Sequence, residues 1–170
     1  MKESAVQHDL ILKGGRVIDP SQRHDGVADV AFKDGKVSAF GKDLSGAKDV
    51  RDVSGYIVTP GLIDMHTHVY WGGTSLGIDA DAYCRNSGVT TSIDTGSAGP
   101  GNWAGFRKHV IEPSQARILA YLHVSFAGIY GFSHRVMVGE SCDLRMMAPT
   151  DCVEVADQSP RLLEVRRPHA

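Results

Sequence analysis

The stretch that decides the fold reads Thr59-Pro60-Gly61-Leu62-Ile63-Asp64-Met65-His66-Thr67-His68. An apolar run that is entered through Pro-Gly predicts a short strand. Side chains at positions i and i+2 of a strand point to the same side, so His66 and His68 are expected to present two imidazoles to one point. Neutral imidazole is a common ligand of divalent ions such as Zn²⁺. The same alternation places Asp64 on that side, where its carboxylate would orient an imidazole.

A His-x-His pair is weak evidence by itself, because the chain holds eight histidines and such a pair arises by chance. Its context strengthens the metal hypothesis. Two neighbouring imidazoles at the end of an apolar strand need partners when buried and repel each other when charged. Packing alone therefore gives no reason for them.

The segments before and after this motif differ in pattern. Residues 8–58 read as short strands and turns, with Asp34-Gly35 between two apolar runs as the strongest hairpin signal. We expect a small antiparallel β-module there, too small to hold a large core alone. After residue 60 the pattern predicts helices over 79–86, 102–112 and 150–156, with Asn102 and Thr150 as N-caps, and strands over 89–94 and 118–124. Strands that alternate with helices indicate a parallel α/β sheet.

Composition excludes several classes of protein. With 18 Lys+Arg against 20 Asp+Glu, the net charge of -2 gives no electrostatic reason to expect nucleic acid or an anionic membrane as a partner. No run approaches the ~18 apolar residues of a membrane span. The polar first seven residues argue against a signal peptide, and three cysteines without a Cys-x-x-Cys pattern fit reduced thiols in the cytoplasm. The 170 residues also fall short of the roughly 250 of a complete (β/α)₈ barrel.

The motif at residues 59–68 resembles the opening strand of the amidohydrolase superfamily, whose hallmark is Pro-Gly-[Leu/Phe]-Ile-Asp-x-His-x-His. Residues 14–19 and 33–37 are similar to the N-terminal segment of that family, and residues 88–91 with 94–99 to its second barrel strand. Residues 102–115 resemble its dihydroorotase-like and D-aminoacylase-like deacetylase branch. The resemblance runs from about residue 8 to about residue 158, most of the chain.

This resemblance implies a small N-terminal β-sandwich module over residues 1–58. It implies the first three to four βα units of a (β/α)₈ barrel over 59–160, which this chain would carry as an apparently truncated barrel. Residues 161–170 depart from the family pattern and form an aberrant tail. It also implies one or two divalent metal ions, with zinc expected and His66 and His68 as ligands. In such enzymes a metal-bound hydroxide attacks the amide or ester carbonyl of a small-molecule substrate.

The later ligands of the family are not found in this chain. The family uses a carboxylated lysine on strand four, histidines on strands five and six, and a general-base aspartate on strand eight. Here the last lysine is Lys108, and the stretch where strand four is expected offers only Glu164 as a stand-in; His169 lies at the chain end. The alternative is therefore a truncated, catalytically incomplete fragment or a non-catalytic remnant. Its open sheet edges would favour a homo-oligomer or pairing with a missing half.

Three further residues are candidates for the substrate side of a barrel mouth. Ser97 follows the strand predicted over 89–94, His123 lies in the strand predicted over 118–124, and His134 lies in a loop beside Arg135, a residue type that binds carboxylates. The alternatives are a satisfied core histidine for His123 and a solvated loop for His134.

Overall fold

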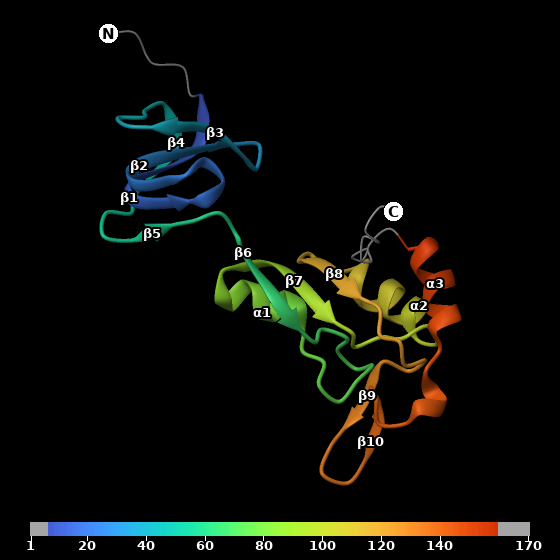
Figure 1. Cartoon of the computed structure of the whole chain (residues 1–170). Helices are drawn as coiled ribbons and strands as arrows, with labels where there is room; N and C mark the ends of the chain where they lie inside the picture. Colours follow the sequence, from blue (N-terminus) through green and yellow to red (C-terminus); the bar gives the residue numbers. More distant parts are fainter. Residues whose placement is uncertain (1–6, 160–170) are drawn as a thin grey trace. The chain divides into compact units, whose positions relative to one another are not determined.

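The computed structural model of the chain describes residues 7–159. The chain divides into two compact units, residues 1–60 and residues 61–170 (Figure 1). The tail 161–170, with Glu164 and His169, lies outside the described residues. No helix within residues 7–159 is both long enough and apolar enough to cross a bilayer.

The N-terminal unit is a single five-stranded mixed sheet (Figure 1). The long strand β1 pairs antiparallel with β2, and β2 pairs antiparallel with β3. β4 and β5 both run parallel to β1. The strand bounds are β1 His8–Asp19, β2 His24–Lys33, β3 Lys36–Gly41, β4 Ala47–Asp52 and β5 Ile57–Val58, with a 3₁₀ turn, η1, at Pro20–Gln22.

The N-terminal unit contains the predicted hairpin but differs from the prediction in strand direction and in the number of sheets. The hairpin at Asp34-Gly35 is confirmed, with positive φ at both residues. The purely antiparallel module is wrong, because the chain returns to β1 twice in the parallel direction. The two-sheet sandwich is not found within residues 7–60: β5 extends the one sheet, and a small apolar cluster lies around Val17, Ala28 and Val30.

The C-terminal unit is built on three parallel strands in the order β6-β7-β8 (Figure 1). The predicted alternation of strands and helices is confirmed, and three parallel strands are described. A short hairpin, β9–β10, was not predicted. The bounds are β6 Leu62–Thr67, α1 Ala80–Ser87, β7 Val89–Thr95, α2 Trp103–Phe106 continued by the π-helix η2 Arg107–Ile111, β8 Arg117–Tyr121, β9 Ile129–Phe132, β10 Met137–Gly139, η3 Leu144–Met146 and α3 Pro149–Asp157.

Capping residues mark both ends of α1, whereas the predicted N-caps of α2 and α3 make no capping bond. The Asp79 carboxylate accepts the N–H groups of the first turn of α1, and Gly88 ends that helix at φ 74°, a conformation that favours glycine. Asn102 stands at the N-cap of α2, but its side chain makes no capping bond; instead it accepts from the Gly99 N–H and donates to the Ala127 carbonyl. Thr150 lies inside α3, because Pro149 takes the first helical position.

One face of the sheet packs against the helices. Phe106, Ile111 and Ile118 are fully buried at this interface, and the Trp103 indole N–H donates to the Ser159 hydroxyl at 2.7 Å. On the opposite face, Ile63 on β6 and Tyr121 on β8 keep large exposed surfaces, whereas Ile93 on the central strand β7 is buried.

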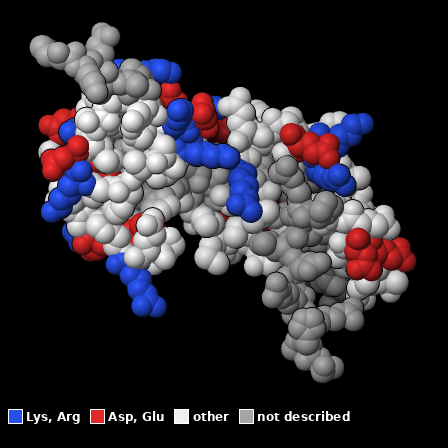
Figure 2. All heavy atoms as spheres, turned by 90° about the horizontal axis from the view of Figure 1, so that it is seen from above, with Lys and Arg blue, Asp and Glu red and all other residues white. Residues whose placement is uncertain are grey.

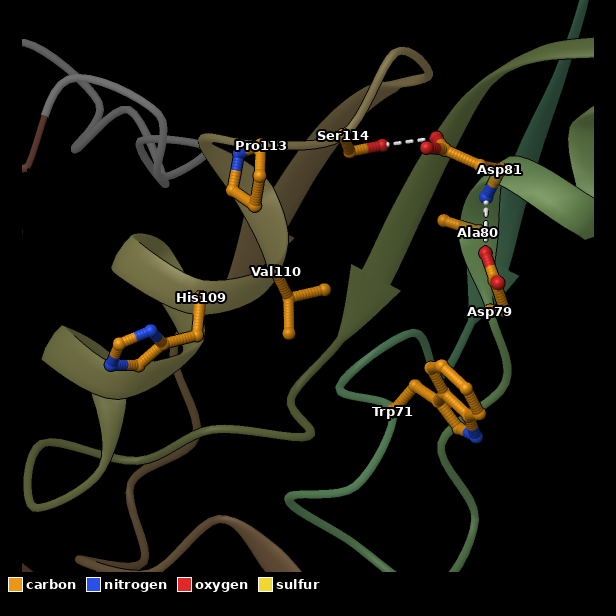
Figure 3. Close-up of a pocket in the computed structure, with 8 residues that line it drawn as sticks. All are labelled: Trp71, Asp79, Ala80, Asp81, His109, Val110, Pro113 and Ser114. Atoms are coloured by element: carbon orange, nitrogen blue, oxygen red, sulfur yellow. Dashed lines mark hydrogen bonds between the residues drawn. The ribbon is translucent and has the colours of Figure 1, made fainter.

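Asp81 ties the start of α1 to the chain that enters β8. Its carboxylate accepts from the Ser114 hydroxyl at 2.6 Å and from the N–H groups of Gln115 and Ala116, each at 3.0 Å. Figure 3 shows the bond to Ser114. The Ser114 hydroxyl, followed by the backbone donors, holds the pKa of Asp81 below its usual value.

Replacing Asp81 by asparagine is expected to lower the free energy of unfolding of the C-terminal unit by about 1–2 kcal/mol near neutral pH, because an amide loses the charge-assisted bonds. Urea unfolding followed by tryptophan fluorescence measures this, since both tryptophans, Trp71 and Trp103, lie in that unit. Glu154→Gln, an exposed carboxylate on α3, is the control. Equal midpoints for Asp81→Asn and Glu154→Gln would contradict this account.

Candidate functional site

A bulge in β6 organises the histidine motif. Asp64 pairs with Ser92 and Thr67 pairs with Asp94, so three residues on β6 advance against two on β7. One extra residue in β6 shifts the alternation of its side chains. Asp64 and Thr67 therefore share one side of the sheet, and His66 and His68, on either side of Thr67, belong to the other.

Asp64 faces α1 rather than the imidazoles. Its carboxylate accepts from the Tyr83 hydroxyl at 2.6 Å and from the backbone N–H of His66 at 3.0 Å. Within residues 7–159 no hydrogen bond joins it to an imidazole ring. The bulge breaks the unbroken alternation on which the expectation for Asp64 rests. Its role as a partner that orients an imidazole stays a prediction. The Tyr83 hydroxyl, and after it the His66 N–H, lowers the pKa of Asp64 from its ordinary value.

The two motif histidines lie side by side. Their ring centroids are 5.5 Å apart at an interplanar angle of 82°. His66 is exposed, whereas His68 is half-buried and its Nδ1 lies 3.1 Å from Oγ of Ser97. This hydrogen bond engages Nδ1 and leaves Nε2 for a ligand. Ser97, expected on the substrate side, is 1% exposed and contacts a histidine ring.

His123 lies just after β8, against the turn that follows β7. A Cβ at Gly96 would stand 3.1 Å from Cδ2 of His123, so the glycine, at φ 97°, allows this approach. The N–H of His123 donates to the Ala98 carbonyl at 2.9 Å, and its Nδ1 accepts from the Ser125 N–H at 2.9 Å. The neutral ring therefore carries its proton on Nε2. Burial lowers the pKa of His123 and favours this neutral form.

His134 lies apart from this group in its contacts. It is exposed in the turn between β9 and β10, where the Ser133 hydroxyl accepts from the N–H groups of Arg135 and Val136. Within the described residues no hydrogen bond ties it to the other histidines. Its role on the substrate side stays a prediction.

The described residues supply part of a metal-ligand set. Across residues 7–159 no group of three or more His, Cys, Asp or Glu side chains is placed to hold a metal ion. Catalytic zinc uses three protein ligands and one open position. The imidazoles of His66 and His68 fit two of those ligands, and Ser97 gives His68 the orienting partner that metal-bound histidines commonly have.

A separate pocket of about 200 Å³ lies among α1, η2 and the chain after β6 (Figure 3). In Figure 3, His109 and Val110 lie across it from Trp71 and Asp79. Its carboxylates already have partners, since Asp79 caps α1 and Asp81 holds the chain before β8. Neither motif histidine lines it.

The surface charge agrees with the composition. On the face drawn in Figure 2, acidic and basic side chains are interspersed among wide uncharged areas. That face offers no single-sign patch for an extended polyanion.

Sequence reasoning missed two residues that shape the site. Tyr83 holds Asp64 from α1, and Asp94 accepts three backbone N–H groups at the strand ends. The run Asp94-Thr95-Gly96-Ser97 carries a signal for the second, because aspartate often accepts from the N–H two residues on in a turn that contains glycine. No local signal pairs Tyr83 with Asp64, which is 19 residues away.

The Tyr83→Phe variant is expected to raise the pKa of Asp64 toward the ordinary aspartate value, because the hydroxyl that stabilises the carboxylate is gone. A ¹³C NMR titration of the Asp64 carboxyl measures the change directly. A depressed pKa in the folded state contributes stability above the unfolded-state value near ~4, and this is lost as pH falls through the folded-state pKa. Tyr83→Phe should therefore shrink the loss of stability between about pH 7 and about pH 3. The exposed Tyr56→Phe serves as control, and an unchanged Asp64 titration in Tyr83→Phe would refute the assignment.

The chain is similar in part to proteins that are named as enzymes. No protein-family model matches it. A deacetylase of Brucella anthropi is 33% identical over 151 residues, which are 87% of this chain and 38% of that protein. An allantoinase of Escherichia coli is 45% identical over 95 residues, or 52% of this chain and 20% of that protein. A solved dihydroorotase structure matches with a TM-score of 0.71 at 28% identity, over 92% of this chain and 41% of that one. The chain thus spans well under half the length of the relatives that it matches.

Proposed function

Because this chain belongs to the amidohydrolase superfamily, matching only part of the length of its relatives, we propose that its strand ends form part of a metal-dependent hydrolase site. The bond cleaved is a non-peptide C–N bond, in a cyclic amide or an N-acyl group, or a related ester. The observation that carries this proposal is the pair of imidazoles at the end of β6, with the Nδ1 of His68 engaged by Ser97. A deacetylase and two enzymes named for cyclic amides among the relatives support the substrate class.

The cofactor we propose is one or two divalent ions, with zinc as the first choice. His66 and His68 would hold it through imidazole nitrogen. When bound, such an ion polarises a carbonyl and makes water acidic enough to ionise near neutral pH. The remaining ligands and the general base would come from parts of the protein beyond residues 7–159, since these residues supply only two ligands.

The chain's own residues have separate roles in this proposal. Ser97 fixes the ring of His68. Asp64 lies at the register shift in β6, and its carboxylate accepts hydrogen bonds from the Tyr83 hydroxyl and from the His66 backbone N–H. His123 is kept neutral by burial and bears its proton on Nε2, which makes it a hydrogen-bond donor for a substrate oxygen.

A second candidate is a chain that binds metal without turnover. The observation that favours it is the incomplete ligand set within residues 7–159. Two histidines hold zinc more weakly than three ligands with good geometry, and they supply no general acid or base for the hydrolysis.

Metal binding and turnover distinguish the two candidates. We expect the purified 170-residue chain to bind Zn²⁺ in competition with a chromophoric chelator, and His66→Asn or His68→Asn to weaken that binding by about tenfold or more. His109→Asn, an exposed histidine on η2, is the matched control. Binding that survives both site substitutions would refute the metal site.

Turnover is then measured with Zn²⁺, Mn²⁺ or Co²⁺ on N-acetyl amino acids, hydantoin, allantoin and dihydroorotate. Hydrolysis that His66→Asn and His68→Asn abolish supports the first candidate for the chain alone. Histidine-dependent binding without hydrolysis supports the second.

A further inference from the structure

We propose that Asp94 is a positioning residue for His68. It fixes the orientation of the His68 ring by holding two backbone segments, the one next to His68 and the one that carries Ser97, the partner of the ring. The inference deepens the proposed function and rests on it for the metal, whereas the geometry stands by itself.

The Asp94 carboxylate is fully buried, with 0% of its surface exposed, and both of its oxygens are engaged. Oδ2 accepts from the N–H of Val69 at 2.8 Å. Oδ1 accepts from the N–H groups of Gly96 at 3.1 Å and Ser97 at 2.7 Å. The donors come from two segments, the chain after β6 and the turn after β7.

These segments are the two that build the histidine contact. Val69 directly follows His68, and Ser97 supplies the hydroxyl 3.1 Å from Nδ1 of His68. One carboxylate thus holds the backbone of the ring and the backbone of the ring's partner. The threonine bonds between the strands, from Thr67 to the Ile93 carbonyl and from Thr95 to the Thr67 carbonyl, join β6 to β7 but reach neither side chain.

The choice of a carboxylate here needs a reason, because burying a charge is costly. No Lys, Arg or His within the described part of the chain lies within salt-bridge distance of Asp94. Three converging N–H groups supply that reason, since a carboxylate offers acceptors at both oxygens and no donor. An asparagine would turn an NH₂ group toward a backbone N–H.

The test compares Asp94→Asn with Ser97→Ala in the metal-free 170-residue chain. Long-range ¹H–¹⁵N NMR of the histidine rings near about pH 8, where imidazole is neutral, reports the tautomer of His68. We expect one dominant tautomer in the wild type and a mixture in both variants. Zn²⁺ affinity, from chelator competition, should fall by about tenfold to a hundredfold in both.

Asp81→Asn is the matched control, because Asp81 also accepts three hydrogen bonds, two of them from backbone N–H groups, at a place away from the histidines. It should lower stability and leave the His68 tautomer and the Zn²⁺ affinity unchanged. A folded Asp94→Asn protein with the wild-type tautomer overturns the proposal. So does an Asp81→Asn protein that changes His68 as much as Asp94→Asn does.

Two results keep the proposal testable if Asp94→Asn does not fold. Scalar couplings across the hydrogen bonds, between the Asp94 carboxyl carbon and the amide nitrogens of Val69 and Ser97, should be present in the wild type. Ser97→Ala should still mix the tautomers of His68. Absent couplings or an unchanged tautomer overturn the proposal. If wild-type protein binds no Zn²⁺, the proposed metal site fails, and the metal-free tautomer data still decide the role of Asp94.

Discussion

A charged group without access to water constrains everything around it, and Asp94 is such a group. Its oxygens must find donors inside the protein, so the chain leaving β6 and the turn leaving β7 have to converge on it. That convergence places His68 against Ser97. The same turn contains Gly96, whose missing side chain lets His123 approach from the end of β8. One desolvated carboxylate thus holds the segments that follow β6 and β7, and the segment after β8 packs against the turn that it holds.

Much of the C-terminal unit could be predicted because its signals are local. Asp79 and Gly88 mark the ends of α1 within a few residues of sequence, and the β-branched run after Gly88 marks β7. The closeness of the His66 and His68 rings follows from alternation over two positions, and Thr67 between them is paired with Asp94, so the bulge does not disturb it. Their role as metal ligands is a matter of chemistry and belongs to the proposed function.

The features that escaped prediction depend on pairing between distant segments. The side that Asp64 faces depends on a one-residue shift against β7, which the sequence of β6 alone does not encode. The parallel return of β4 and β5 to β1 depends on where short loops cross, and apolar periodicity is the same for either direction. Ser97 was expected to meet substrate because it follows a strand, yet its burial comes from the turn that Asp94 holds.

Because of the bulge in β6, pairing with β7 does not depend on the residues between Asp64 and Thr67, one of which is His66. Sheet pairing is satisfied by residues on either side of the bulge, at Asp64 and at Thr67. A chain that lost the one surplus residue between them could keep the parallel ladder, its helices and its apolar interface. If that residue were Met65, Thr67 would still separate His66 from His68 and both imidazoles would keep their side of the sheet. If it were His66, the ladder could remain while one imidazole of the pair was lost. A single-codon deletion could therefore leave a well-folded protein with no histidine pair at its strand ends, so that retention of the fold in a descendant says little about retention of the site.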